Sequence, residues 1–176
     1  MDEATTDAAV VVRQLQPQDL EAVIALDARS TGRRRDEYFK LKLKQALSDT
    51  GIQVSLAAEV ERAFAGFLLA RVYYGEFGMT EPAAALDTLG VRPELRGRHV
   101  GAALLEQLRA NLLGLGIPRL QTEVAWDNLD LIAFFHHEGF RPAQRLCLEL
   151  DLAAARTRAE RREDEAGNDQ GTSGRA

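Results

Sequence analysis

The sequence predicts an α/β fold in which helices cover the faces of a mixed sheet. Three features of the chain support this expectation. Of its 176 residues, 45% are hydrophobic, which is enough for one domain of ordinary size whose core needs no disulfide or metal. Strand-like and helix-like segments follow the order strand, two helices, three strands, helix, strand, helix, strand. No internal repeat is present, so a single core is expected.

The first part of the chain is expected to form one strand and two amphipathic helices. Residues 10–15 have the pattern of a strand. Pro17 and Asp19 are typical of a helix start, and this helix is expected to end near Gly32. A second helix is expected over 33–48. Apolar residues at helical spacing predict the buried faces: Leu20, Val23, Ile24 and Ala25 in the first helix, and Tyr38, Leu41, Leu43 and Leu47 in the second.

The middle of the chain predicts a hairpin, because two strand-like segments, 52–59 and 63–74, flank a polar turn at Glu61-Arg62. A helix over 97–115 carries its apolar residues at helical spacing. The other elements expected are a loop over 75–82, strands over 83–91 and 120–126, a helix over 128–138 and a last strand over 145–152. The apolar set of the 97–115 helix is Val100, Leu104, Leu108, Leu112 and Leu115.

Composition narrows the class of protein. Residues 1–9 and 153–176 are polar and are expected to be disordered, which leaves a folded domain over 10–152. The only cysteine, Cys147, is expected in the core, and neither it nor the histidines have the spacing of metal ligands. No segment approaches the ~20 apolar residues of a membrane span. A formal net charge of −5 argues against a nucleic-acid surface, and the chain is expected to be soluble and cytoplasmic.

One segment has the features of an anion site. The strand that ends at Val91 leads through Pro93 into residues 96–101, Arg-Gly-Arg-His-Val-Gly, which open a helix. The first N–H groups of a helix have no internal partners, and the helix dipole adds partial positive charge, so a pyrophosphate fits there.

Four residues of this segment favour such a role. Gly97 and Gly101 allow the backbone to approach phosphates, and Arg96 and Arg98 supply charge-assisted contacts. A Rossmann dinucleotide site is disfavoured, because no acidic residue ends a following strand in the required arrangement.

These residues resemble the main signature of the GNAT superfamily of N-acetyltransferases, a strand, Val-x-Pro, and then Arg/Gln-x-x-Gly-x-Gly/Ala at a helix start. Val91, Pro93, Arg96 and Gly101 match it. The sequence departs from the signature at His99, where the family usually has glycine, and the departure bears on cofactor affinity.

A second signature of the same family follows at the expected spacing. Residues 122–128, Thr-Glu-Val-Ala-Trp-Asp-Asn, precede the aromatic pair Phe134-Phe135 and then Gly139-Phe140. The resemblance implies a mixed, mostly antiparallel sheet of six to seven strands flanked by about four helices.

The resemblance also implies that acetyl-CoA is the acyl donor. Asn128 is expected to contact the pantetheine arm, although Asp127 or Asn128 also suits a helix cap. Backbone N–H groups between Leu89 and Val91 are expected to meet the oxyanion. The residues that the resemblance assigns to acetyl-CoA are Leu89, Val91, Arg96, Gly97, Arg98, His99, Val100, Gly101, Ala102, Asn128 and Phe135.

Two acidic residues are candidates for the general base that acetyl transfer to an amine requires. Glu123 is the first candidate, because a Glu directly before Val on this strand resembles the base of peptide N-terminal acetyltransferases. Asp87 on the neighbouring strand is the second. The alternative for each is a structural ion pair or a charge at the sheet edge.

The general acid is missing from its usual place. Family members commonly have a Tyr where this chain has Phe135, which cannot donate a proton. Tyr73, Tyr74 or His136 could replace it, although each also suits a structural role. The thiolate of coenzyme A is a tolerable leaving group even without an acid, because the pKa of its thiol is comparable to that of cysteine.

The acceptor is expected between residues 30–39 and the loop 73–81, by resemblance to the family. The second helix is basic, and this suits either a solvated helix face or an acidic acceptor. Its basic residues are Arg33, Arg34, Arg35, Lys40, Lys42 and Lys44.

Three functions remain open. The first is an acetyl-CoA-dependent N-acetyltransferase acting on a small amine, a peptide N-terminus or a lysine. The second is a non-catalytic acyl-CoA-binding sensor or interaction module, motivated by Phe135 and His99. The third is an interaction protein without a cofactor site. By resemblance a homodimer through the last strands is also expected.

Overall fold

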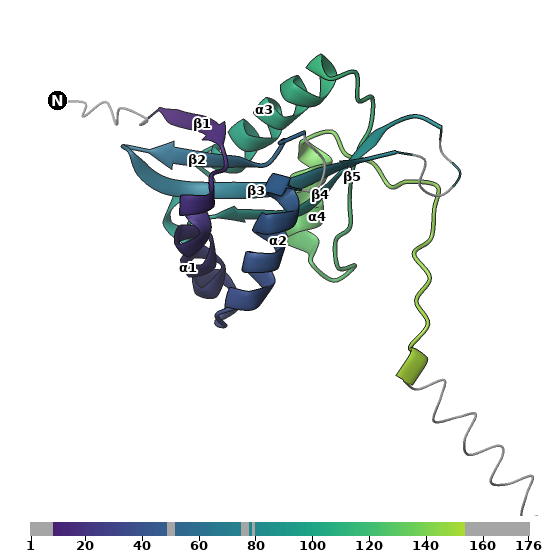
Figure 1. The fold of residues 1–176 in the computed structure, drawn as a ribbon, viewed down its shortest axis with the longest axis horizontal. Helices are drawn as coiled ribbons and strands as arrows, with labels where there is room; N and C mark the ends of the chain where they lie inside the picture. The colour runs from purple at the N-terminus through teal and green to yellow at the C-terminus, as the bar shows by residue number, and fades with distance from the viewer. Residues whose placement is uncertain (1–8, 49–51, 75–77, 79, 154–176) are drawn as a thin grey trace, which may run out of the picture. The chain divides into compact units, whose positions relative to one another are not determined.

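A computed structural model gives the fold, and it describes residues 9–48, 52–74, 78 and 80–153 (Figure 1). The chain divides into two compact units, residues 1–140 and 141–176. The sheet and its helices belong to the first unit. The segments expected to be disordered fall almost entirely outside the described residues, and the folded domain expected over 10–152 stays a prediction.

The first unit contains a five-stranded sheet with the strand order β1-β2-β3-β4-β5. Neighbouring strands are antiparallel except β5, which runs parallel to β4. The prediction of a mixed, mostly antiparallel sheet is therefore confirmed, and the expected six to seven strands are corrected to five in the described residues. The strands are β1 (Val10–Gln14), β2 (Leu56–Val60), β3 (Ala63–Tyr73), β4 (Ala83–Val91) and β5 (Leu120–Thr122).

The expected hairpin joins β2 and β3. Glu61 and Arg62 both have positive φ values, 51° and 63°. Two central residues with positive φ define the type I′ turn, whose twist matches that of the flanking strands. The structure confirms the tight turn, and β2 begins at Leu56, four residues later than expected.

Helices cover both faces of the sheet (Figure 1). Their positions agree with the expected segments, although α2 begins three residues later than expected, where Asp36 and Glu37 place negative charge in its first turn. The helices are α1 (Leu20–Thr31), α2 (Asp36–Ser48), α3 (Val100–Gly114) and α4 (Leu129–His137).

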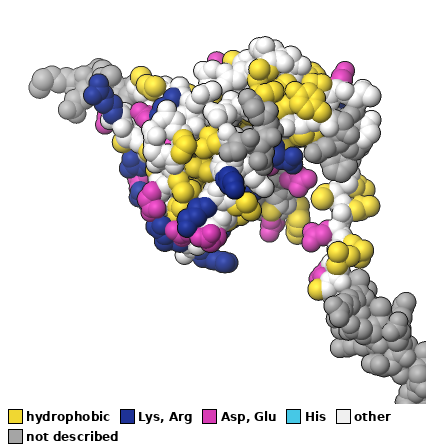
Figure 2. All heavy atoms as spheres, in the orientation of Figure 1, with side chains coloured by type: hydrophobic (Ala, Val, Ile, Leu, Met, Phe, Trp, Pro, Cys, Tyr) yellow, Lys and Arg dark blue, Asp and Glu magenta, His cyan; other side chains and the backbone are white. Residues whose placement is uncertain are grey.

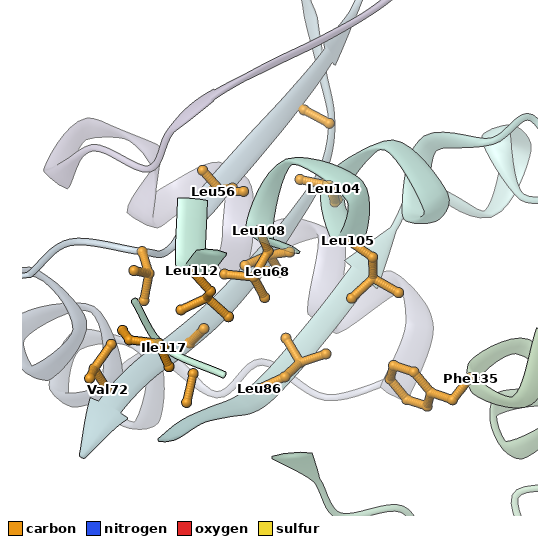
Figure 3. Close-up of a cluster of buried hydrophobic side chains, with 14 of the residues drawn as sticks. Leu56, Leu68, Val72, Leu86, Leu104, Leu105, Leu108, Leu112, Ile117 and Phe135 are labelled. Carbon is orange, nitrogen blue, oxygen red and sulfur yellow. The ribbon is translucent and has the colours of Figure 1, made fainter. Parts of the chain in front are cut away.

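The core has one cluster on each face of the sheet. Leu104, Leu108 and Leu112 of α3 pack on the face formed by Leu68, Ala70, Val72 and Leu86, and Phe135 of α4 joins them (Figure 3). The other face, with Phe67 and Leu69, packs against α1 and α2. Alternate residues of β3 thus point to opposite faces, as the pleat of a strand requires.

The buried faces of three helices differ in part from the expected ones. In α1, Leu26 is buried and Ala25 is exposed, and in α2 the buried aromatic residue is Phe39, whereas Tyr38 and Leu41 are exposed. Leu115 follows the last residue of α3 and is also exposed. The apolar residues of α2 are so evenly spread that its buried face depends on where the preceding turn aims the helix.

The prediction of a last strand over residues 145–152 is wrong, because the structure has no strand there. The segment has no strand pairing, and its alternate leucines are exposed. Cys147 is exposed as well, not part of the core. The alternating pattern is that of a strand, but a strand forms only when a neighbour satisfies its backbone groups.

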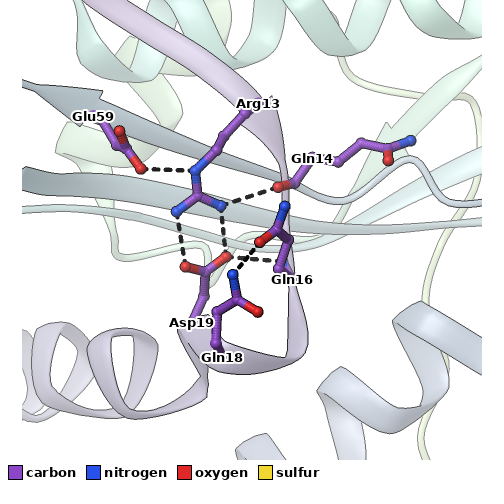
Figure 4. A network of polar contacts seen from close by, with 6 residues as sticks. All are labelled: Arg13, Gln14, Gln16, Gln18, Asp19 and Glu59. Carbon is purple, nitrogen blue, oxygen red and sulfur yellow. Dashed lines mark hydrogen bonds and ion pairs between the residues drawn. The ribbon is translucent and has the colours of Figure 1, made fainter. Parts of the chain in front are cut away.

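A polar network ties β1, β2 and the start of α1 together (Figure 4). The Arg13 guanidinium donates to both carboxylate oxygens of Asp19, at 2.7 and 2.8 Å, and to Oε1 of Glu59 at 2.7 Å. The backbone N–H of Gln16 donates to the same Asp19 carboxylate at 2.8 Å. Asp19 is only 6% exposed. This network connects the β1–β2 pair to the residue that precedes α1.

Candidate functional site

The candidate site begins where β4 and β5 separate. The two strands pair only from Ala84 to Leu86 of β4, opposite Leu120 to Thr122 of β5. The Thr122 hydroxyl donates to the Leu86 carbonyl at 2.9 Å and marks the last contact of the pair. β5 therefore ends four residues earlier than expected. Beyond this point β4 continues to Val91, and among the described residues it pairs there with β3 alone, so its other edge has no strand partner.

A β-bulge lies at the point of separation. Leu86 pairs with Ala70 and Thr88 pairs with Leu69, so Asp87 is the extra residue. The extra residue shifts the alternation of β4, so that even-numbered residues face α3 before the bulge and odd-numbered residues face it afterwards. Ala84 and Leu86 face it before the bulge, and after it Leu89 and Val91 pack on the same core, as partly buried residues.

The start of α3 presents free backbone donors. His99 is the N-cap, and the first bond of the helix runs from the Ala103 N–H to the His99 carbonyl, at 2.9 Å. Among the described residues, the N–H groups of Val100, Gly101 and Ala102 donate to no acceptor. The helix dipole adds partial positive charge at this end. Both features suit a pyrophosphate.

Gly101 is buried where α3 meets α4 and β4. A Cβ at this position would lie 3.2 Å from Cζ of Phe134 and 3.7 Å from Cγ2 of Val91. The Phe134 ring therefore limits the space beside the first turn of α3. Any larger residue at position 101 must displace this ring or move the N–H groups around it.

Arginine side chains surround the same helix start. Arg96 and Arg98 are exposed, and Arg96 donates to the Ser30 hydroxyl of α1 at 3.5 Å, the limit of a hydrogen bond. Arg92 lies in a 3.7 Å ion pair with Glu94, yet its buried Nε has no hydrogen bond within the described residues. Arg92 is a further cation in this segment that the motif did not single out, and Glu94 partly offsets its charge.

Two residues that the resemblance assigned to the cofactor have structural roles. The Asn128 side chain accepts a hydrogen bond from the Leu131 N–H at 3.2 Å and caps α4. Phe135 is 5% exposed, and its ring centre lies 5.0 Å from that of Phe140 in the core. A cap can still face a ligand, but the buried Phe135 ring acts chiefly by holding α4 in place.

The two candidate bases have different surroundings. Glu123 is exposed, one residue beyond the end of β5, and makes no hydrogen bond or ion pair within the described ranges. Asp87 lies in the bulge, 3.3 Å from Nζ of Lys42 and 3.8 Å from Nε of Arg71. Glu123 thus has no charged partner among the described residues, while Asp87 pairs with cations from α2 and β3.

The substitute acids are less well placed. Tyr73 donates its hydroxyl proton to Oε1 of Gln121 at 2.9 Å. It pairs with Ala83 at the closed end of the β4–β5 pair, whereas the opening lies beyond Leu86. Tyr74 is exposed. Most of the loop expected over 75–82 lies outside the described residues.

The basic residues around α2 are largely paired. Arg34 contacts Glu21 and Asp36, and Arg35 binds both oxygens of Asp27. Figure 2 shows basic and acidic side chains interspersed over this side of the first unit. Lys40 pairs with Glu37. This pattern favours the solvated helix face over a site for an acidic acceptor.

The His99 backbone gives a stability prediction. Its φ of 59° and ψ of 6° are left-handed, a region that costs most residues about 1–2 kcal/mol but costs glycine nothing. We therefore expect His99→Gly to raise the free energy of unfolding in urea by about 1 kcal/mol, and His99→Val to lower it. Equal stability of the two variants would contradict this assignment.

The described residues contain neither a metal-binding cluster nor a membrane-spanning helix. Among the residues that the structure describes, no three or more His, Cys, Asp or Glu side chains gather in a way that could hold a metal ion. No described helix is both long and apolar enough to cross a membrane.

Comparisons with known proteins agree on one family. A sequence profile of the Acetyltransferase (GNAT) family matches residues 20–140. The aminoglycoside N-acetyltransferase AAC(6')-Iy, in complex with CoA, has a TM-score of 0.70 and 18% identity over 82% of this chain and 96% of its own.

Two further structures illustrate the range of proteins with this fold. A ribosomal-protein-alanine N-acetyltransferase from Brucella melitensis biovar Abortus 2308 has a TM-score of 0.65 and 18% identity, over 82% of this chain and 99% of its own. A transcriptional regulator from Bacillus halodurans C-125 has a TM-score of 0.68 and 17% identity, over 82% and 100%. At such identities these similarities establish the fold.

Proposed function

Because this chain belongs to the acetyltransferase (GNAT) family, we propose that it transfers the acetyl group of acetyl-CoA to a primary amine. The observation that carries the proposal is the set of unpaired N–H groups of Val100, Gly101 and Ala102, close in sequence to the open edge of β4. Similar structures include an N-acetyltransferase in complex with CoA, which supports the choice of donor. The acceptor is a small amine, a peptide N-terminus or a lysine.

The donor binds in two parts under this proposal. The N–H groups at the start of α3 bind the pyrophosphate, with charge from Arg96 and Arg98. The pantetheine arm enters the opening between β4 and β5 and pairs with the free edge of β4 near Leu89 and Val91. Because Gly101 has no side chain, the first turn of α3 is slim enough for the donor to approach it beside the Phe134 ring.

Bound acetyl-CoA supplies a thioester carbonyl that an amine can attack directly. Glu123 accepts a proton from the acceptor, directly or through water, so that the neutral nitrogen can form the new C–N bond. The nitrogen then loses its second proton to solvent, the C–S bond breaks, and the thiolate takes up a proton from solvent, because Phe135 has none to give. Backbone N–H groups between Leu89 and Val91 stabilise the oxyanion.

Calorimetric titration of the CoA-stripped protein with acetyl-CoA tests the donor site first. Micromolar binding is expected, followed by thiol release when a panel of amines is added. A protein that binds no CoA species would refute both the enzyme and any acyl-CoA sensor.

Gly101→Val tests the placement of the pyrophosphate. The valine side chain must displace Phe134 or the N–H groups of the first turn, so the Kd for acetyl-CoA is expected to rise at least ~10-fold, about 1.4 kcal/mol. Gly114→Ala is the matched control at the other end of α3, because a Cβ there meets nothing within 4 Å. Unchanged binding in both variants would move the pyrophosphate away from α3.

A non-catalytic acyl-CoA sensor is the second candidate, favoured by one observation. The position usually occupied by a proton-donating Tyr holds Phe135, which is buried in the core. Acetyl-CoA binding without thiol release across small amines, peptides and lysine side chains would favour the sensor over the enzyme.

A further inference from the structure

The chain has only three lysines, and all of them lie on α2. Its 22 Lys and Arg residues include Lys40, Lys42 and Lys44, and every other one is arginine. Residues two apart on a helix point to opposite sides, so Lys42 lies on the other side of α2 from the other two lysines. Lys40 and Lys44 are exposed, and Lys40 pairs with Glu37. Lys42 instead reaches the sheet, where it contacts Asp87 of β4.

The Lys42 amine lies at the point where β4 separates from β5. Its Nζ is 3.3 Å from Oδ2 of Asp87, the extra residue of the bulge. The two side chains are 28% and 23% exposed, so solvent and small molecules reach the pair. α2 packs on the face of the sheet opposite to α3. A donor that binds at the start of α3 and extends along the edge of β4 therefore meets this amine from the other face.

The expected position of the thioester is close to this amine. In the proposed function the oxyanion forms beside the backbone from Leu89 to Val91, and Leu89 is two residues beyond Asp87. Two residues of a strand span roughly 6.6 Å, a separation that the flexible four-carbon stem of a lysine can bridge by changing rotamer. Arg71 lies 3.8 Å from the same oxygen of Asp87, so the carboxylate keeps a neighbouring cation when Lys42 turns toward the donor.

The choice of lysine at this position favours chemistry over charge neutralisation alone. Arginine binds a carboxylate through two N–H groups, and the chain uses it for the buried carboxylates of Asp19 and Asp27. Arginine cannot lose its proton in a protein, whereas lysine becomes a nucleophile when a base removes one. Lys42 has such a base within hydrogen-bond distance in Asp87.

We propose, on the basis of the proposed function, that Lys42 accepts an acetyl group from the acetyl-CoA bound to its own chain, with Asp87 as the base. Asp87 removes one proton from the ammonium group, and the neutral nitrogen attacks the thioester carbonyl to form the C–N bond. The nitrogen then loses a second proton to solvent, the C–S bond breaks, and the thiolate takes up a proton from solvent. The resulting amide has no charge, so acetylation removes the ion pair between Lys42 and Asp87.

Mass spectrometry of the full-length protein after incubation with acetyl-CoA tests the proposal. One acetyl group per chain is expected on Lys42, formed at least ~10-fold faster than on Lys40 or Lys44, because the Lys42 amine is held beside the donor. The rate per chain should be independent of protein concentration, since the transfer occurs within one molecule. Excess desulfo-CoA, which has no thiol to carry an acetyl group, should block the modification of Lys42 by occupying the donor site.

Two substitutions separate this transfer from chemical acetylation of exposed lysines. Lys42→Arg keeps a positive charge beside Asp87 and should take up no acetyl group over the same period. Lys40→Arg, on the other side of α2, is the matched control and should still take up one. Asp87→Asn should slow the acetylation of Lys42 by about 100-fold, because the base is lost.

Three results would overturn the proposal: an unmodified Lys42, equal acetylation of the three lysines, or a rate that rises with protein concentration. Thiol release with the panel of amines, measured on the same preparation, distinguishes this failure from failure of the proposed function. Release with an unmodified Lys42 would leave the acetyltransferase standing without the internal acceptor. No release and no modification, in a protein that binds acetyl-CoA, would refute both.

Discussion

Glu123→Gln is expected to lower kcat by about 100-fold while leaving the Kd for acetyl-CoA unchanged. Positioned general bases contribute at least this much, and glutamine keeps the size of the side chain but cannot accept the proton. Glu123 is exposed beside the open end of the β4–β5 pair, with no partner in the described ranges that would hold its carboxylate elsewhere. Thiol release with a responsive amine measures kcat, and calorimetry measures Kd.

Asp87→Asn is the comparison that distinguishes Glu123 from the second candidate base. Asp87 pairs with Lys42 and lies near Arg71, so its loss should change kcat less than the loss of Glu123. The reverse order, with full activity in Glu123→Gln and a large loss in Asp87→Asn, would make the bulge residue the base. Full activity in both variants would leave proton removal to water.

Most elements could be predicted from the sequence, because their patterns are local. The spacing of apolar residues placed α1 and α3, and Glu61-Arg62 was correctly expected as the hairpin turn. The buried face of α2 was not predictable, because Tyr38, Phe39, Leu41 and Leu43 are all apolar and tertiary packing selected Phe39 and Leu43.

Strand lengths depend on pairing, which is not a local property. The segment from 120 to 126 reads as one strand, but only Leu120 to Thr122 have a partner. The alternation of 145–152 is clear, yet no strand of the described chain pairs with this segment. Sequence alternation therefore identifies residues able to form a strand without showing that another strand is available.

The candidate site was predictable where a motif carries it. The glycines and arginines of 96–101 indicated a helix start with free donors, which the structure contains. The bulge at Asp87 was not predictable, since it follows from the register of β3 against β4. Phe134 was named only as part of the aromatic pair of the second signature, and no sequence signal placed its ring against Gly101. Arg92 lies between Val91 and Pro93 of the motif, so it could have been recognised from the sequence as a further cation, but it was missed.

Replacing Asp19 with alanine is expected to lower the free energy of unfolding by about 2 kcal/mol, because the variant loses two hydrogen bonds from a charged group that is only partly buried. Asp19 is 6% exposed and holds Arg13 through two hydrogen bonds, while Glu59 still pairs with Arg13 in the variant. Urea unfolding at neutral pH measures the loss. Glu37→Ala, which removes an exposed partner of Lys40 in the first turn of α2, is the control and should lower the free energy of unfolding by less than about 1 kcal/mol.

The pH dependence separates the charge of Asp19 from its packing. Burial raises the pKa of Asp19, but the hydrogen bonds from Arg13 and the Gln16 N–H and the charge of Arg13 outweigh it, so the pKa lies below its ordinary value. A carboxyl with a lowered pKa in the folded state stabilises the protein above its unfolded pKa of about 3.9, and this stabilisation is lost as the pH falls through the folded value. The stability difference between wild type and Asp19→Ala should therefore be constant from pH 7 to about pH 5 and should shrink below about pH 4. A difference that stays constant down to acid unfolding would assign the effect to packing, because removal of the side chain acts equally at every pH.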